Sequence, residues 1–264
     1  MTITIKDVIH QLTKQIPEVE NTVDILKSGQ LDTIVKGIGT TFLATQAVIE
    51  QAIDLDINLL ISHEGAFYSH RDNEGMLEGD PVSDKKRALI EESGIAIFRF
   101  HDYIHRYQPD GITEGLLRSL DWKNYIDENN PVSSILTLPP KSLGDIVEEI
   151  KCKLSIPYVR VVGEASQVCQ RVGILVGYRG GGAHTIPLYH KNELDLMIIG
   201  EGPEWEAPEY VRDAIHQGRN NALIVLGHAE SEMPGMEYLV ETIKTAFPTI
   251  PVKYLHEKPI FTIM

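Results

Sequence analysis

Three apolar runs that each end at a histidine constrain the fold of this chain more than any other feature. The runs cover residues 57–62, 95–100 and 222–227, and the residues that follow them are His63, His101 and His228. Short aliphatic and β-branched runs of this kind are typical of buried strands in a mostly parallel sheet. Ligands of open α/β sheets bind beside the carboxyl ends of the strands. The pattern therefore predicts an α/β fold with a histidine-lined site at strand ends.

Helical and strand patterns alternate along the whole chain. In the first half we expect helices at 6–14, 41–54 and 84–93, and strands at 33–38, 57–62 and 95–100. In the second half we expect helices at 143–154, 206–217 and 234–246, and strands at 158–162, 172–177, 194–199, 222–227 and 252–255. This βαβ rhythm predicts mixed or mostly parallel sheets flanked by helices.

A polar stretch in the middle of the chain is the best candidate for a boundary between two lobes. It covers residues 119–140 and contains the turn-forming sequence Asn-Asn-Pro. We expect approximate lobes at 1–125 and 126–221, with 222–264 returning to complete the site. The site itself is expected in the cleft between the lobes.

Charge and cysteine content narrow the class of protein. The 264 residues include 24 basic and 38 acidic side chains, a formal net charge of −14. This balance argues against a nucleic-acid partner and suits a site that attracts cations. The two cysteines, Cys152 and Cys169, make no disulfide framework, which indicates a reducing cytosol. No apolar stretch reaches membrane-spanning length and the first twenty residues carry charges throughout, so we expect a cytoplasmic protein without a membrane partner.

Acidic residues or further histidines accompany the first two strand-end histidines. Glu64 directly follows His63. His105 stands four positions after His101, so the two imidazoles share one face if this segment is helical. Asp102 is a candidate ligand, or a carboxylate that orients a histidine. Each cluster alone has a bland alternative, a surface His-Glu pair for the first and a solvated helix start for the second.

The third cluster surrounds His228 and contains Glu230 and Glu232. A residue before proline favours extended geometry, so Glu232 is expected just ahead of a helix that begins near Pro234. Its carboxylate could then reach back towards His228, whereas the bland alternative makes both glutamates helix-start acids. Three such clusters at matching strand ends together predict a metal site. Nitrogen and oxygen ligands without thiolates suit zinc, manganese, iron or cobalt, and five ligands fit two ions that share a bridging carboxylate.

A glycine-rich turn, Gly177 to Gly182, follows the expected strand at 172–177. It resembles a phosphate-binding turn but has neither the Walker pattern nor the dinucleotide fingerprint, so a plain strand-to-helix turn is the simpler interpretation. Four other histidines have no acidic or histidine neighbour at useful spacing and are interpreted as structural or surface residues: His70, His190, His216 and His256.

The three clusters in this order resemble the Nif-three-like family, also known as GTP cyclohydrolase 1 type 2 homologues. Family members show a strand ending in His-His, then His-x-x-x-Asp, and near the C-terminus Gly-His-x-x-x-Glu. This chain has Ser62-His63-Glu64, His101-x-x-x-His105 and Gly227-His228-x-x-x-Glu232. The resemblance covers nearly the whole length, so residues 1–264 are expected to form a single unit of this family with its two-lobed fold.

The resemblance implies a particular ligand set. One ion would be held by His63, His228 and Glu232, and the other by Glu64, His105 and Glu232, with Glu232 bridging. His101 would be an auxiliary ligand or an orienting partner. Glu64 stands where the family has histidine and His105 where it has aspartate, and we interpret this exchange as a reciprocal ligand swap.

The resemblance also implies a function and an assembly. We expect a cytoplasmic, dinuclear metal-dependent hydrolase that acts on a phosphorylated or nucleotide-like small molecule, with Glu230 as a candidate proton acceptor. Family members form ring-like hexamers, so a homohexamer is expected. Two alternatives stay open: a non-catalytic metal-binding scaffold or regulatory protein, and a nucleotide-binding module that uses the Gly177–Gly182 turn.

Overall fold

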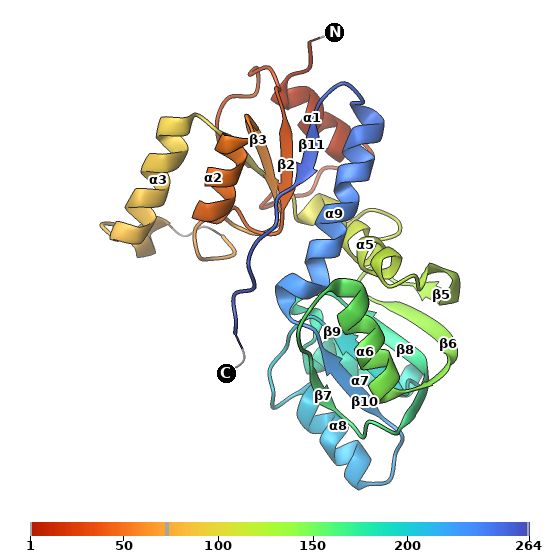
Figure 1. Cartoon of the computed structure of the whole chain (residues 1–264). Coiled ribbons are helices and arrows are strands. Elements are labelled where there is room, and N and C mark those ends of the chain that lie inside the picture. Colours follow the sequence, from red (N-terminus) through yellow and green to blue (C-terminus); the bar gives the residue numbers. More distant parts are fainter. Residues whose placement is uncertain (1, 72–73, 263) are drawn as a thin grey trace. The chain divides into compact units, whose positions relative to one another are not determined.

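A computed structural model describes residues 2–71, 74–262 and 264 and divides the chain into two compact units. Unit 1 comprises Met1–Tyr107 and Met236–Met264, and unit 2 comprises Gln108–Gly235. Each unit has its own mixed sheet with helices on its faces (Figure 1). The predicted fold class is therefore confirmed.

Unit 1 is built on a five-stranded sheet in the order β1-β4-β3-β2-β11. Its strands are β1 (Leu26–Ser28), β2 (Ile38–Thr41), β3 (Leu59–Ser62), β4 (Ala96–Arg99) and β11 (Val252–Tyr254). All pairs are parallel except β1 with β4. The register sets Ser62 opposite Arg99, so the residues that follow β3 and β4 leave the sheet at the same edge.

Helices cover both faces of this sheet. On one face α2 (Gln46–Asp54) and α3 (Pro81–Ser93) close a core of aliphatic side chains that includes Val48, Leu60 and Ile97 (Figure 1). On the other lie α1 (Ile5–Thr13) and the later part of α9 (His228–Ala246), where the Thr40 hydroxyl donates to the carbonyl of Met236. A single turn, α4 (Asp102–His105), follows β4, and a 3₁₀ turn, η1 (Glu74–Leu77), precedes α3.

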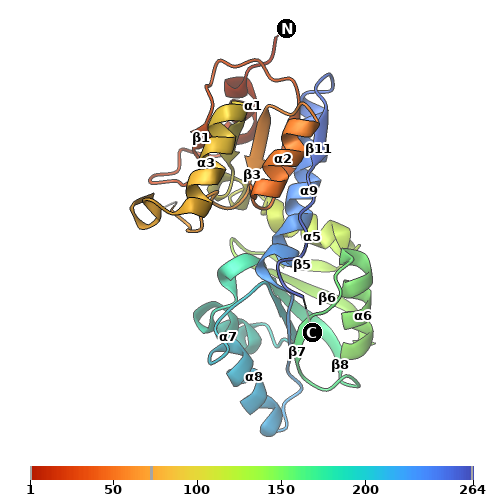
Figure 2. The ribbon, with the colours of Figure 1, turned by 60° about the vertical axis from the view of Figure 1, so that its left-hand side comes forward.

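Unit 2 is built on a six-stranded sheet in the order β5-β6-β8-β9-β10-β7. Its strands are β5 (Ile126–Asn129), β6 (Ser134–Ser142), β7 (Arg160–Val162), β8 (Val168–Leu175), β9 (Leu196–Ile199) and β10 (Ala222–Val225). Strands β8, β9 and β10 are parallel and the others pair antiparallel. Helices α7 (Gly182–Lys191) and α8 (Ala207–His216) cover one face and α6 (Leu143–Leu154) the other (Figure 2). The unit also contains α5 (Gly111–Ser119) and the 3₁₀ turns η2 (Lys123–Tyr125) and η3 (Gly177–Arg179).

Several expected elements are confirmed with their caps. Helix α3 ends at Gly94, whose φ of +66° is the left-handed conformation expected there. The Ser142 hydroxyl accepts from the backbone N–H of Asp145 and caps α6 as predicted. Among the described residues, no helix combines the length and apolar character that a membrane span requires.

Two expectations in the first half are wrong. The strand expected at 33–38 lies at 38–41. Gly39 breaks the β-branched pattern of this strand, which hid it in the sequence. Glycine fits there because an added Cβ would contact the side chains of Leu60 and Leu255. The helix expected from 41 begins at Gln46, after Thr45 accepts from the N–H of Val48 as its N-cap. The prediction also overlooked β5 and β6 within the polar stretch at 119–140, because β6 runs through a Pro-Pro pair and both strands carry polar exposed residues.

The helix expected from Pro234 begins six residues earlier, at His228. Glu232 therefore lies inside α9 rather than ahead of it. Proline in a helix interior removes one backbone hydrogen bond, which normally disfavours such a helix. The helix continues through Pro234 in a region where α9 packs closely on α5 within unit 2. A Cβ added at Gly235 would lie 2.5 Å from Ile112 Cα.

Candidate metal centre

Three imidazoles of unit 1 come together at the carboxyl edge of its sheet. His63 follows β3, His101 follows β4, and His105 ends α4. The ring centroids lie 4.7 Å apart for His63 and His101, and 5.0 Å apart for the two pairs that include His105. One ring nitrogen from each lies within 4.8 Å of the other two. The structure therefore brings these three histidines together, as their positions at strand ends predicted.

The ring of His63 is fully buried and oriented by the backbone. Its Nδ1 lies 3.1 Å from the carbonyl oxygen of Phe100. Because a carbonyl only accepts, Nδ1 carries the proton of the neutral ring, and Nε2 has the lone pair. This orientation is typical of histidines that bind a metal through Nε2.

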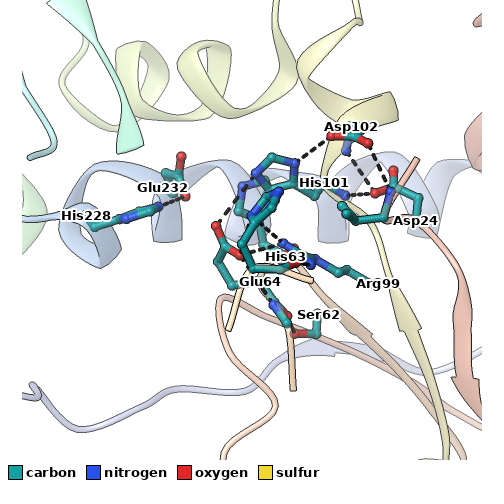
Figure 3. Close-up of polar contacts among 12 residues, drawn as sticks. Asp24, Ser62, His63, Glu64, Arg99, His101, Asp102, His228 and Glu232 are labelled. Atoms are coloured by element: carbon teal, nitrogen blue, oxygen red, sulfur yellow. Dashed lines mark hydrogen bonds and ion pairs between the residues drawn. The ribbon is translucent and has the colours of Figure 1, made fainter. Parts of the chain in front are cut away.

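The ring of His101 is oriented by a carboxylate (Figure 3). Its Nδ1 lies 3.0 Å from Asp102 Oδ1. This hydrogen bond, helped by those from Val23 N–H and the Thr22 hydroxyl, holds the pKa of Asp102 well below its usual range. Asp102 therefore stays ionised. Asp102 was predicted either to bind a metal or to orient a histidine. The geometry favours the orienting role, because its oxygens contact His101, Thr22 and Val23.

The turn that carries His101 is fixed by a residue that the sequence analysis missed. The buried carboxylate of Asp24 accepts from the backbone N–H groups of His101, Asp102 and Tyr103 (Figure 3). Burial raises the pKa of Asp24, while these three donors oppose the rise. Nothing in the spacing of Asp24 points to this role, because 77 positions separate it from His101.

Glu64 is held by a buried arginine. Glu64 Oε2 lies 2.6 Å from Arg99 Nη2, while Oε1 lies 3.6 Å from His101 Nε2 (Figure 3). Arg99 is 1% exposed and also donates to the carbonyl oxygens of His63 and His70. The guanidinium therefore offsets the charge of the Glu64 carboxylate. The sequence signal for Arg99, a lone cation inside an apolar strand, was overlooked.

His70 is not the isolated residue that the sequence suggested. Its Nδ1 lies 3.1 Å from Arg99 Nη2 and 3.8 Å from Glu64 Oε2, and a nitrogen of His70 falls within 4.8 Å of ligand atoms of Glu64 and His101. Burial and the adjacent Arg99 charge lower the pKa of His70. The His70 Nδ1 accepts a hydrogen bond from the Arg99 guanidinium, so this nitrogen already has a cationic partner.

Unit 2 contains the third predicted cluster. His228 Nε2 lies 3.0 Å from Glu232 Oε2, one helical turn away on α9 (Figure 3). His228 Nδ1 lies 2.9 Å from Glu201 Oε1. A neutral imidazole has only one N–H, so one of these nitrogens meets a carboxylate oxygen through its lone pair. A proton or a metal cation at that nitrogen relieves the repulsion. Glu201, which follows β9, is therefore a further residue that orients the His228 ring.

The glycine-rich turn makes room for Glu232. Gly177 has φ +61°, and a Cβ there would lie 2.0 Å from Glu232 Oε1. A phosphate in this turn would need free backbone N–H groups, but two of them already have acceptors. Gly182 N–H donates to Glu206 Oε2, and Gly180 N–H donates to the carbonyl of Glu201. The segment forms η3 followed by α7, as the strand-to-helix interpretation predicts.

Glu230, the candidate proton acceptor, lies in the first turn of α9. Its carboxylate folds back on the chain: a Cβ added at Gly227 would lie 2.0 Å from Glu230 Oε2. The donor atoms of the two clusters are imidazole nitrogens and carboxylate oxygens, the set that zinc, manganese, iron and cobalt accept. Neither cysteine belongs to a possible ligand group among the residues that the structure describes.

Two curated relatives carry the name GTP cyclohydrolase 1 type 2 homolog. The one from Chlamydia trachomatis is 22% identical over 231 residues, covering 84% of each chain, and the one from Clostridium acetobutylicum is 22% identical over 230 residues, covering 84% of this chain and 81% of its own.

Solved structures share the fold over the full length. A hypothetical protein of Staphylococcus aureus superposes with a TM-score of 0.77 at 20% identity, and a Bacillus cereus protein related to NIF3 with 0.76 at 14% identity; each match covers 100% of both chains. The sequence profile of one family matches residues 4–259. The chain therefore belongs to the Duf34/NIF3 (NGG1p interacting factor 3) family.

Proposed function

We propose that this chain binds divalent transition-metal ions and is a metal-dependent hydrolase for a phosphorylated or nucleotide-like small molecule. The observation that carries the proposal is the trio of His63, His101 and His105, whose nitrogens lie within 4.8 Å of one another. Hydrogen bonds at Nδ1 leave Nε2 as the ligand atom of His63 and of His101. The name of the curated relatives is in keeping with hydrolysis of a nucleotide-like substrate.

The first ion is assigned to the three imidazoles of unit 1. His228 and Glu232 of unit 2 are proposed as further ligands of the centre, on the strength of the family resemblance. A second ion would need Glu64 to divide its carboxylate between Arg99 and the metal, because Arg99 already holds one of its oxygens. The dinuclear form therefore depends on Glu64 more than on any other ligand.

A bound metal would supply Lewis acidity that polarises a phosphoryl or carbonyl oxygen and activates water. The surrounding residues would keep the donors in place. Asp102 holds the His101 ring and Glu201 holds the His228 ring, each through Nδ1. Glu230 is proposed to accept a proton, since carboxylates serve as general bases when they lie within reach of the attacking water.

The test combines metal analysis with a substrate panel. Protein loaded separately with Zn, Mn, Fe or Co is assayed against phosphomonoesters, phosphodiesters and nucleotides. We expect turnover with at least one metal, and we expect His63→Ala and Glu232→Ala to abolish it. His190→Ala, an exposed histidine of α7, is the matched control and should leave it unchanged.

Metal binding without turnover on any substrate would overturn the hydrolase assignment and favour the non-catalytic scaffold. We also propose the homohexamer that the resemblance implies. Light scattering should then give a mass six times that of the 29.6 kDa chain, whereas a monomer would contradict it.

A further inference from the structure

Two aromatic rings of unit 2 are unusually exposed. Trp205 is 78% exposed and Tyr178 is 70% exposed, although tryptophan is highly buried on average in proteins. Tyr178 lies in η3, directly after β8, and Trp205 lies in the loop between β9 and α8. Both loops follow the carboxyl ends of parallel strands, which is the edge where α/β sheets bind their ligands.

The two loops that carry these rings are hydrogen-bonded to each other. Glu201 N–H donates to the carbonyl of Gly177 at 2.9 Å, and Gly180 N–H donates to the carbonyl of Glu201 at 3.1 Å. A Cβ added at Gly202 would lie 2.5 Å from the carbonyl oxygen of Gly180. The two backbones therefore approach each other closely, and the two rings are carried by one continuous surface.

The backbone around Trp205 is held on both sides. Before it, Glu204 Oε1 lies 3.0 Å from Arg160 Nη1, and after it the carboxylate of Glu206 accepts from the N–H of Gly182. A side chain on a fixed backbone loses less conformational freedom when a ligand binds to it. The Trp205 ring is therefore preorganised for contact with a ligand.

The backbone around Tyr178 is held in the same way. Gly177 N–H donates to the hydroxyl of Ser231 at 2.9 Å, and Arg179 Nη1 lies 2.9 Å from Asp110 Oδ2. Asp110 is buried, so the pair is shielded from solvent on one side. Tyr178 thus stands between two anchored residues while its own ring stays exposed.

Glu201 connects this surface to the candidate metal ligands of unit 2. Its backbone joins the two loops, and its Oε1 lies 2.9 Å from His228 Nδ1. The loop that carries Trp205 also contains Glu204 and Glu206. Three carboxylates disfavour an anionic group here, and they favour a neutral ligand that presents N–H or amino groups.

We propose that Trp205 and Tyr178 form a stacking platform for the purine ring of a nucleoside or nucleotide substrate. The proposal rests on the hydrolase function above, because it names the part of the substrate that unit 2 would bind. Aromatic side chains stack on nucleobases, and a bicyclic purine covers more of an indole ring than a pyrimidine does. A tryptophan or tyrosine contributes about 150–250 Å² of contact area, whereas a stable protein interface needs about 800 Å² from each partner. Two rings therefore suit a small molecule better than a second protein.

The probe is adenosine, which has no phosphate and so tests the platform separately from hydrolysis. Its affinity is measured by isothermal titration on the full-length chain loaded with metal. We expect Trp205→Ala to weaken binding by about tenfold, and Trp205→Phe, which keeps a stacking ring, by less than about threefold. Tyr178→Ala should weaken it by about threefold or more. The matched control is Tyr125→Ala, because Tyr125 is a partly exposed aromatic residue of the same unit that precedes the edge strand β5.

Fluorescence gives a second readout. The chain has two tryptophans, and Trp122 is 2% exposed, so adenosine should quench mainly the emission of Trp205. The quenching should disappear in Trp205→Phe.

Adenosine that does not bind, that binds equally well to Trp205→Ala, or that is weakened equally by Tyr125→Ala would overturn the inference. A Trp205→Ala variant with unchanged adenosine affinity but a changed mass in light scattering would assign the ring to contacts between copies of the chain instead. Adenosine binding that depends on Trp205 in a protein without turnover would keep the platform and reject only the hydrolase function.

Discussion

At the scale of single residues, the sequence identified the clustered histidines better than the groups that orient them. His63, His101 and His105 were found because each stands at or near a strand end, where the fold class itself brings side chains together. Arg99 and Asp24 were missed because their partners are set by the folded loops and not by spacing along the chain. The same reason explains why the contacts of His70 with Arg99 and Glu64 were not predicted.

The ion pair between Arg99 and Glu64 should matter for stability. Removing one member of a buried pair leaves an uncompensated charge, which costs about 3–5 kcal/mol when both members are fully buried. Glu64 keeps some exposure, so we expect Arg99→Met to lower the free energy of unfolding by about 2–4 kcal/mol. Chemical denaturation of the variant and the wild type measures this difference in the free energy of unfolding. Adding Glu64→Gln to this variant should restore part of the loss, and strictly additive effects would contradict the pairing.

Gly177 should be required for the position of Glu232. Gly177→Ala must place a Cβ 2.0 Å from Glu232 Oε1 and adopt φ +61°, so it should lower both stability and metal affinity. Gly218→Ala is the control, because it has φ +79° but open space around the added Cβ. The control should lose only about 1–2 kcal/mol of stability, because alanine disfavours the left-handed conformation, and a metal titration should show unchanged metal affinity. Equal metal affinity in the two variants would rule out this role of Gly177.

At the scale of elements, the strands were predicted well where their runs are continuously apolar. Strands β3, β4, β9 and β10 are buried at every position and match the expected runs to within two residues at each end. Strands β5 and β6 were overlooked because both are partly exposed and β6 also contains a Pro-Pro pair. The early start of α9 was missed because packing on α5 overrides the local preference of Pro234.

The contact between α5 and α9 gives a prediction at this scale. Gly235→Ala should force the two helices apart, because the new Cβ would lie 2.5 Å from Ile112 Cα, and overpacking of this kind costs about 1–3 kcal/mol. Gly144→Ala in α6 is the helical control, since its nearest neighbour would lie at 3.3 Å. Thermal unfolding should show a clear loss for the first variant and little or none for the second. A Gly235→Ala variant as stable as the wild type would contradict the close packing.

At the scale of the whole molecule, the fold class followed from the alternation of helical and strand patterns. The sequence analysis also expected residues 222–264 to return, but it could not predict which strand the returning segment would join. Unit 1 takes back residues 236–264, and β11 pairs in parallel with β2. Such long-range pairing has no local signal, because the contacts of a short strand depend on which edge is left open elsewhere.

The returning segment also predicts a dependence of stability on pH. Burial raises the pKa of Glu257, so the folded chain holds this proton more tightly than the unfolded chain does. The contribution of Glu257 to stability should therefore fall as the pH rises from its ordinary pKa of 4.5 through the raised value. Urea denaturation between pH 4.5 and 8 should show the wild type losing stability relative to Glu257→Gln. A constant difference across this range would contradict the raised pKa.

The central claim is that His63, His101 and His105 bind a transition metal. The most direct measurement is diffraction from metal-replete crystals at the absorption edges of Zn, Mn, Fe and Co. We predict an anomalous peak about 2.0–2.2 Å from Nε2 of His63, with His101 and His105 as further ligands. Metal-replete protein with no ion at these three histidines, or with its ions only on exposed side chains elsewhere, would contradict the account.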